Sequence, residues 1–370
     1  MKPVLFVTGH VPAYRVGALE RLHEREGIEV ALFGGSSLHG GPRFAGELPF
    51  PSRRVEPAQL ARMAASRRHR AVVCPTGGRL ALLATWSGAR AGRLPLILWA
   101  SLWAHPRSAA HALSYLPVRR LYRSAEAVVT YGPHVSDYVT ARGARNVHIA
   151  PQSVDNRFWG DPAASGRTPA WPLAAADAPE QRRGMRFMFV GRAAPEKGVG
   201  VLLAAWRAAR LARGPATLAL VGVGSGFRAG ESAQTGAEVL SMDAVTPPEL
   251  RDLYAAADVL VVPSVATRTF REPWGLVVNE AMNRGLAVIA SDAVGAAAGG
   301  LVRDGENGLV VRAGEERALA EALERLAGDP ERTARMGAAG ALAVQAYDHD
   351  AWAAGFSRAL ATVGLSRTRW

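Results

Sequence analysis

Residues 186–198 read RFMFVGRAAPEKG, an apolar run that stops at Gly191 and a short loop that ends at Gly198. The run is typical of a buried strand, and helical spacing of apolar residues follows over 199–212. Further apolar runs then alternate with helical stretches, namely ATLALVGVG, EVLSM, VLVVPS and LAVIASD, with a helix around 248–257. This alternation predicts βαβ units on a parallel sheet.

The first half of the chain repeats the pattern. Its apolar runs are VLFV, IEVALFGG, AVVCPTG, PLILWAS, AVVTYG and VHIAP. Residues 155–184 interrupt the alternation, because they are rich in Pro, Ala and Gly and hold no sustained period, as a linker does. A chain of 370 residues also exceeds the usual size of one domain.

The sequence therefore predicts an α/β protein of two Rossmann-like domains. We expect an N-terminal domain over 1–165, a linker over 166–184 and a C-terminal domain over 185–349. The parallel sheets should face a central cleft, since open α/β sheets bind ligands beyond the carboxyl ends of their strands. A last helix at about 350–366 could pack on either domain.

The net charge of +12 is concentrated in the first half of the chain. Residues 1–175 carry 22 Lys and Arg against 10 Asp and Glu, whereas the remainder carries 22 against 22. Many of these cations come in close pairs: Arg53, Arg54, Arg67, Arg68, Arg70, Arg119, Arg120 and Arg123. The asymmetry favours an anionic acceptor or membrane surface, which a helix containing VRRLYRS could contact through its Leu and Tyr. The alternative is an Arg-rich solvated face.

Two features indicate the compartment. The N-terminal apolar run is broken by Gly9, His10 and Pro12, far short of a signal peptide or spanning helix. The single cysteine, Cys74, cannot form an intramolecular disulfide and lies in an apolar run, so we expect a small buried hydrophobe and a cytoplasmic protein.

Arg192 and Lys197 lie on the loop between the strand that ends at Gly191 and the following helix. A helix N-terminus favours anions, so two cations beside it suit a bound anion such as a diphosphate. The alternative is a solvated loop in which Lys197 pairs with Glu196 or Glu180.

A second stretch, REPWGLVVNE at 271–280, has a turn and then a helix. Glu272 precedes this helix and Glu280 lies within it, while the amides of Gly275 and Leu276 belong to its start. Those amides could meet a phosphate, which the glycine leaves unobstructed. The alternative makes Glu280 an ordinary helical partner of Arg284.

A glycine-rich turn at Gly222 and Gly224 follows the strand ATLAL. It has no Lys-Ser or Lys-Thr behind it and so is no Walker loop. It is compatible with a nearby nucleotide base and equally with a plain strand exit. Residues 303–308, RDGENG, are typical of a turn.

In their order along the chain, these stretches resemble the nucleotide-sugar-binding domain of the retaining glycosyltransferases of family 4, which have the GT-B fold. The resemblance covers 186–311 and continues in the tail pattern GDPERTARMG. It rests on VGRAAPEKG, ELRDLYAAADVLVVPS, the two glutamates of 271–280, EAMNRG, VIASD and VRDGENGLVV.

The resemblance implies a role for each site residue. Arg192, Lys197, Gly275 and Leu276 would bind the donor diphosphate, and Glu280 would accept hydrogen bonds from the ribose. Glu272 would face the transferred sugar as a catalytic residue, and Gly222 and Gly224 would lie near the base. In the family a histidine often follows the fourth strand of the first domain, and His105 is the candidate here.

One departure concerns the first loop, where many members carry a glycine pair and this chain has the single Gly9. A contact from this loop to the donor is therefore in doubt.

The resemblance further implies transfer of a sugar with retained configuration from a nucleotide sugar, such as a UDP-sugar or GDP-sugar. The expected acceptor is an anionic or lipid-linked glycan, a sugar or a secondary metabolite, and no cofactor is expected. The resemblance also implies a metal-independent site, and the one Asp-x-Asp of the sequence, Asp348-His349-Asp350, lies outside the stretches that carry the resemblance.

Two alternatives remain. A sugar phosphorylase or a nucleotide-sugar hydrolase would keep the same phosphate-binding residues. A nucleic-acid-binding protein, suggested by the isoelectric point of about 10.8, is more remote, because interleaved aromatics and nucleic-acid modules are missing from the sequence.

Overall fold

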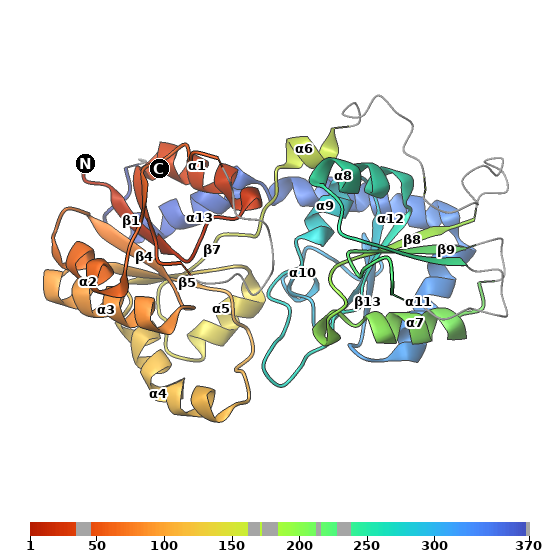
Figure 1. The fold of residues 1–370 in the computed structure, drawn as a ribbon, viewed down its shortest axis with the longest axis horizontal. Helices are drawn as coiled ribbons and strands as arrows, with labels where there is room; N and C mark the ends of the chain where they lie inside the picture. The colour runs from red at the N-terminus through yellow and green to blue at the C-terminus, as the bar shows by residue number, and fades with distance from the viewer. Residues whose placement is uncertain (35–45, 162–170, 172–183, 212–215, 228–237, 368–370) are drawn as a thin grey trace. The chain divides into compact units, whose positions relative to one another are not determined.

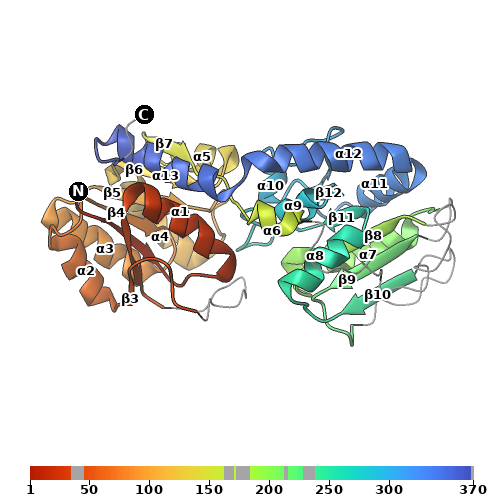
Figure 2. The same cartoon turned by 90° about the horizontal axis from the view of Figure 1, so that it is seen from above.

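The computed structural model describes residues 1–34, 46–161, 171, 184–211, 216–227 and 238–367. The chain forms two compact units (Figure 1). Unit 1 comprises Met1–Asp155 and Tyr347–Trp370, and unit 2 comprises Asn156–Ala346. Each unit has a parallel sheet with helices on both faces (Figures 1 and 2).

The sheet of unit 1 has seven strands in the order β3-β2-β1-β4-β5-β6-β7. The strands are β1 (Val4–Thr8), β2 (Ile28–Leu32), β3 (Ser52–Arg54), β4 (Ala71–Pro75), β5 (Leu96–Ala100), β6 (Ala127–Thr130) and β7 (Val147–Ile149). The helices are the 3-10 helix η1 (Ala13–Arg15), α1 (Val16–Glu26), α2 (Pro57–Ala65), α3 (Arg79–Gly92), α4 (Ala109–Ser124), α5 (Pro133–Thr140) and α13 (His349–Thr362).

Successive residues of β1 point to opposite faces of this sheet, and both faces are buried. Leu5 and Val7 belong to the core beneath α2 and α3, whereas Phe6 belongs to the core beneath α1 and α13. Burial on both faces explains why the strands read as continuous apolar runs. The last helix packs on unit 1, where the ring of Phe356 lies 5.6 Å from that of Phe6.

Cys74 is a buried core residue, as predicted. Burial raises the pKa of its thiol to about 12, so the thiolate is strongly disfavoured. Cys74 therefore contributes to the fold by packing in the core, and its thiol is not activated as a nucleophile.

The edge strand β3 was not predicted from the sequence.

The prediction that the Leu and Tyr of VRRLYRS contact a membrane is wrong. Leu121 and Tyr122 are 7% and 2% exposed and lie in the core of unit 1, so they cannot touch an apolar boundary. Among the described residues, no helix combines the length and apolar character needed to span a membrane.

The sheet of unit 2 has six strands in the order β10-β9-β8-β11-β12-β13. The strands are β8 (Arg186–Val190), β9 (Thr217–Val221), β10 (Glu238–Met242), β11 (Val259–Val262), β12 (Ala287–Ser291) and β13 (Gly308–Val311). The helices are α6 (Asn156–Gly160), η4 (Pro195–Lys197), α7 (Val199–Ala208), α8 (Pro247–Ala256), α9 (Val277–Asn283), α10 (Gly295–Ala298), α11 (Glu316–Gly328), α12 (Pro330–Ala343) and η5 (Val344–Ala346).

The strand order of unit 2 reverses at β8, which pairs with β9 on one side and β11 on the other. Such a reversal separates the loops at the carboxyl ends of the two strands and leaves room for a ligand between them. In unit 2 this position corresponds to the loops after β8 and β11.

The two units divide between Asp155 and Asn156, ahead of the boundary expected at residue 165. The short helix α6 packs within unit 2, because Asn283 Nδ2 donates to Asn156 Oδ1 at 2.9 Å and the Arg251 guanidinium lies 4.6 Å from the Phe158 ring. Most of the expected linker, 166–184, lies outside the described residues.

Candidate active site

The loop after β8 is held in one conformation by Gly198. This residue has φ of +71°, and a β-carbon built on it would lie 2.0 Å from the carbonyl oxygen of Pro263, at the end of β11. Only glycine fits so close to another backbone in this conformation. The loops after β8 and β11 thus meet, and the side chain of Lys197 is positioned between them.

Lys197 forms an ion pair with Glu272. Its Nζ lies 2.5 Å from Glu272 Oε2, and the two side chains are 22% and 7% exposed. Low exposure makes such a charge-assisted hydrogen bond stronger than a surface pair. The structure thus brings together the predicted diphosphate ligand and the predicted sugar-facing carboxylate, 75 residues apart. Of the alternative partners, Glu196 accepts from Arg192 instead, and Glu180 lies outside the described residues.

Arg192 occupies the same loop but is much more exposed. Its side chain is 54% exposed, and its Nη2 lies 3.4 Å from Glu196 Oε1, a long contact that contributes little in solvent. The two predicted cations therefore differ, since Lys197 is fixed in place and Arg192 is free to reorient.

The segment from Glu272 to Trp274 is anchored to the loop after β12. Glu272 forms a bridge with Val294, and its carbonyl accepts from Gly295 N at 3.1 Å. The buried Trp274 Nε1 donates to Asn279 Oδ1 at 2.8 Å. These contacts hold the Glu272 backbone against the sheet, so the carboxylate has a defined position.

Gly275 and Leu276 lead directly into α9. Gly275 has φ of +91°, which favours glycine, and its carbonyl accepts from Val278 N at 3.0 Å. The amides of Gly275 and Leu276 donate no hydrogen bond to the part of the chain that the structure describes. Both N–H groups are thus available to an anion, and their role in binding a diphosphate stays a prediction.

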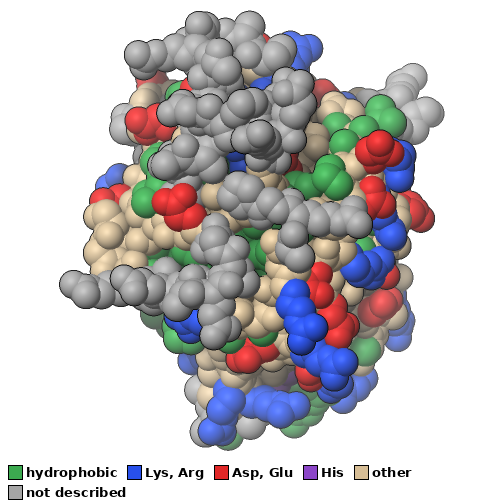
Figure 3. Space-filling model, turned by 90° about the vertical axis from the view of Figure 1, so that its right-hand side faces the viewer, with side chains coloured by type: hydrophobic (Ala, Val, Ile, Leu, Met, Phe, Trp, Pro, Cys, Tyr) green, Lys and Arg blue, Asp and Glu red, His purple; other side chains and the backbone are tan. Residues whose placement is uncertain are grey.

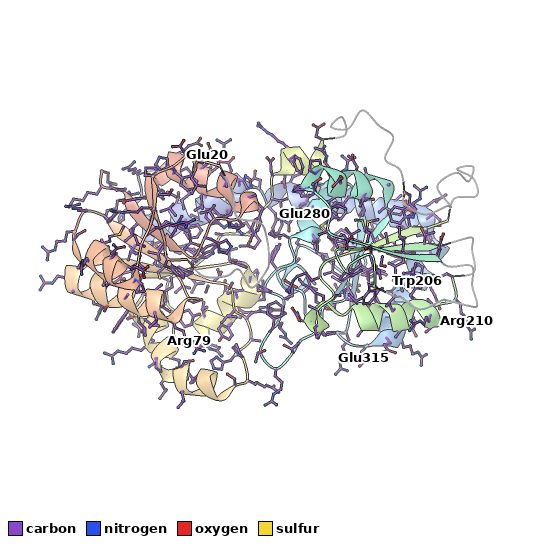
Figure 4. All side chains as sticks on the ribbon, viewed as in Figure 1. Glu20, Arg79, Trp206, Arg210, Glu280 and Glu315 are labelled. Atoms are coloured by element: carbon purple, nitrogen blue, oxygen red, sulfur yellow. The ribbon has the colours of Figure 1, made fainter. Side chains whose placement is uncertain are left out.

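Glu280 lies on α9 (Figure 4) and accepts a hydrogen bond from Tyr254 on α8. The Tyr254 Oη donates to Glu280 Oε2 at 3.0 Å. Burial raises the pKa of Glu280 to about 7, although the tyrosine hydroxyl partly offsets this effect. The alternative pairing with Arg284 is not what the structure shows, because Arg284 Nη1 donates to the carbonyls of Gly160 and Asp161.

Sequence reasoning missed Tyr254. The residue is fully buried, and burial together with the nearby Glu280 raises the pKa of its hydroxyl. It lies in the last turn of an ordinary amphipathic helix, so the sequence offers no local signal that distinguishes it from a core aromatic.

The glycine turn after β9 is tied to the end of β10. Gly222 N and Gly224 N both donate to Met242 O, at 3.0 and 3.2 Å. The next residue, Ser225, donates through its backbone and its hydroxyl to Asp243, each at 3.0 Å. This turn follows the neighbour of β8 and so lies at the same edge of the sheet as the Lys197 loop.

His105 belongs to unit 1, in the segment after β5. Its Nδ1 lies 3.2 Å from Tyr138 Oη, and its ring packs edge-on against Tyr115 at 5.4 Å. The strand before it is the fifth of unit 1, because β3 adds an edge strand that the sequence did not predict. The catalytic assignment of His105 remains a prediction.

Comparisons with known proteins show what parts of the chain are similar to. Residues 184–329 match the glycosyl transferases group 1 family. A D-inositol 3-phosphate glycosyltransferase of Streptomyces griseus is 39% identical over 180 residues, which cover 44% of this chain and 36% of that protein. An alpha-maltose-1-phosphate synthase of Mycolicibacterium smegmatis is 30% identical over 241 residues, covering 60% of this chain and 59% of that protein.

Solved structures match over nearly the whole chain. The Anabaena protein HepE, in complex with UDP and glucose, superposes with a TM-score of 0.72 at 19% identity, covering 98% of this chain and 100% of that one. Sucrose-phosphate synthase from Thermosynechococcus elongatus gives a TM-score of 0.69 at 19% identity, with 98% and 99% covered. At these identities the likeness concerns the fold.

The family match lies in the second unit, and the chain spans just over a third of the length of the inositol-phosphate relatives. The structural matches extend across both parallel sheets. Together these comparisons show that residues 184–329 match the glycosyl transferases group 1 family and that the whole chain has the GT-B fold of glycosyltransferases.

Proposed function

We propose that this protein is a retaining glycosyltransferase that moves a hexosyl group from a nucleoside-diphosphate sugar to an acceptor. The ion pair of Lys197 with Glu272 carries the proposal, because it places a half-buried cation and a buried carboxylate together at the strand-order reversal of unit 2. The matching family and the structural neighbour with UDP and glucose support the same chemistry.

Charge stabilisation of the leaving group is the main task we assign to the site. As the bond between sugar C1 and the diphosphate oxygen breaks, negative charge grows on the diphosphate and positive charge on C1. Lys197, Arg192 and the amides of Gly275 and Leu276 would stabilise the diphosphate, since preorganised donors act strongly on developing charge. These cations are side chains, so we expect transfer without a metal ion.

Glu272 would support the cationic sugar electrostatically and orient it. The acceptor oxygen would bond to C1 on the face that the diphosphate leaves, which retains the configuration, and its proton would pass to the departing diphosphate. His105 is the further candidate for contact with the sugar. In the free protein Glu272 neutralises Lys197, and we propose that the diphosphate takes over this cation when the donor binds.

Glu280 would accept hydrogen bonds from the ribose hydroxyls, and the turn at Gly222 and Gly224 would border the base. UDP is the first donor nucleotide to test, because the Anabaena structure contains it, and GDP is the second. The acceptor would be an anionic or lipid-linked glycan, a sugar or a secondary metabolite, reached at the cytoplasmic face of a membrane.

A thermal-shift panel of UDP, GDP, ADP and dTDP tests the donor site. A ligand at 100 times its dissociation constant stabilises the protein by about 2.7 kcal/mol, so one nucleotide should shift the melting temperature by several degrees. No shift with any of the four would contradict the proposal.

Incubation with the donor sugar alone separates the remaining alternatives. A transferase should release nucleotide slowly without an acceptor. Fast release in water would indicate a hydrolase, and fast release that requires inorganic phosphate would indicate a phosphorylase.

A further inference from the structure

Almost all of the excess positive charge of the chain comes from one segment. Residues 57–125 contain 11 arginines and no Asp or Glu, so this stretch alone accounts for +11 of the net +12. Residues 156–346 of unit 2, in contrast, carry 21 basic and 21 acidic residues. Figure 3 shows basic and acidic side chains interspersed on a face of unit 2. Composition bias toward arginine does not explain why acidic residues are missing from one segment only.

The acid-free segment contains α3, whose solvent side carries leucines beside arginines. Leu80 is 73% exposed and Leu83 is 50% exposed. They closely follow the exposed Arg79, which Figure 4 labels, and lie about two to three turns before the exposed Arg90. A single exposed leucine needs no explanation, but two on one stripe with flanking cations resemble the apolar and polar sides of an interfacial helix.

Helix α4 repeats this arrangement. Leu113 and Leu116 are 82% and 71% exposed, and Arg120 is exposed one turn further along the same side. The opposite side carries Leu121 and Tyr122, which are buried in the core. The helix is therefore anchored by one side, while its leucines on the other side remain in solvent.

The two helices are neighbours in the fold (Figure 1), and Trp86 Nε1 on α3 donates to Ser124 Oγ on α4 at 3.2 Å. None of Arg79, Arg90 and Arg120 forms an ion pair with a residue that the structure describes. We group the exposed residues of these two neighbouring helices under one name, the leucine–arginine face: Arg79, Leu80, Leu83, Leu113, Leu116 and Arg120.

We propose that the leucine–arginine face docks unit 1 on an anionic lipid bilayer. Arginines without acidic neighbours would be attracted to acidic headgroups, and the leucines would enter the boundary between headgroups and acyl chains. A nucleic acid would satisfy the arginines but leave the leucines in water, so the leucines favour a membrane. The proposal rests on the proposed function, in which the acceptor is reached at a membrane, and it names the surface that would contact that membrane. Its test measures vesicle binding and does not depend on turnover of a sugar donor.

Flotation of the full chain with vesicles tests the proposal. The protein should float with vesicles that contain about one-third phosphatidylglycerol at low salt, and much less with pure phosphatidylcholine. Raising the salt to about 0.5 M should weaken the binding, because the Debye length falls to a few ångströms.

Two double variants locate the contact. The Arg79→Gln, Arg120→Gln protein should bind acidic vesicles about thirtyfold more weakly, since each cation near the surface contributes about 1 kcal/mol and 1.4 kcal/mol is tenfold. The Leu113→Ser, Leu116→Ser protein should bind at least about tenfold more weakly, because two leucines lose their apolar contact.

Matched controls lie in unit 2. Arg317→Gln with Arg335→Gln removes the same charge from exposed positions, and Leu342→Ser removes a leucine that is 78% exposed on α12. Neither control should change vesicle binding by more than about twofold, the scale expected for substitutions outside the contact.

Three results would overturn the proposal: no flotation with acidic vesicles at low salt, equal losses in the controls and the face variants, or a leucine variant that binds as wild type does. Tight binding to duplex DNA that is insensitive to the leucine pair, together with absent flotation, would instead identify a nucleic-acid surface. The UDP thermal shift should be the same in wild type and face variants, so failure of the donor site and failure of the membrane face appear in different measurements.

Discussion

Replacing Glu280 with Gln should stabilise the protein while impairing nucleotide binding. Burial raises the pKa of this carboxyl from 4.5 to about 7, and each unit between these values corresponds to about 1.4 kcal/mol. Charging Glu280 in the folded state therefore costs up to about 3 kcal/mol at pH 8. Glutamine keeps the size and an oxygen that accepts the Tyr254 hydrogen bond, so the variant should escape most of this cost.

The raised pKa of Glu280 determines how the stability of the folded protein changes with pH. A carboxyl whose folded pKa is raised favours folding when it is protonated, and this stability is lost as the pH rises from 4.5 through 7. The melting temperature of Glu280→Gln should thus equal that of wild type near pH 4.5. Its advantage should grow to at most about 12 °C at pH 8, given about 3 kcal/mol and about 2–4 °C per kcal/mol for a domain of this size.

Differential scanning calorimetry at several pH values, with Glu331→Gln as an exposed control, measures this advantage. An advantage that is absent at pH 8, or that does not change between pH 5 and 8, would refute the reasoning. The variant should also bind UDP at least about tenfold more weakly, because a charge-assisted hydrogen bond to the ribose contributes roughly 1.5–3 kcal/mol.

Four further substitutions test the site. Lys197→Ala and Arg192→Ala should each lower transfer at least about tenfold with the fold intact, since each removes a charge-assisted contact of roughly 1.5–3 kcal/mol; wild-type activity in both would exclude the diphosphate role. Glu272→Gln should lower turnover while UDP affinity stays equal or becomes tighter, because Lys197 loses its competing carboxylate; calorimetry and steady-state kinetics separate the two effects. Gly198→Ala should destabilise the protein by at least about 2 kcal/mol in urea titrations, owing to its positive φ and the nearby Pro263 carbonyl.

The sequence predicted the two parallel sheets because both faces of each are buried, which turns strands such as β8 and β9 into continuous apolar runs. It did not predict β3, since Ser52–Arg54 is an exposed edge strand of polar residues. It also left the packing of α13 open, because an amphipathic helix does not specify which sheet it covers. Its place on unit 1 depends on contacts such as Phe356 with Phe6.

The positions of Arg192, Lys197, Glu272 and Glu280 in their loops and helix followed from local patterns and from the family resemblance. Their partners did not. Lys197 meets Glu272 only because β8 and β11 are neighbours in the sheet, and Glu280 meets Tyr254 only because α8 and α9 pack together. The partners of these two contacts are 75 and 26 residues apart in the sequence. Such contacts depend on strand order and helix packing, which local sequence patterns do not encode.

Titration calorimetry of the purified chain with UDP in the presence of EDTA tests the central claim most directly, with Lys197→Ala measured alongside. We expect saturable binding of one nucleotide per chain that persists in EDTA and weakens at least about tenfold in the variant, as expected for loss of a charge-assisted contact. Binding that EDTA abolishes and added Mg²⁺ restores, or equal affinity in wild type and Lys197→Ala, would contradict a donor site in which protein side chains hold the diphosphate.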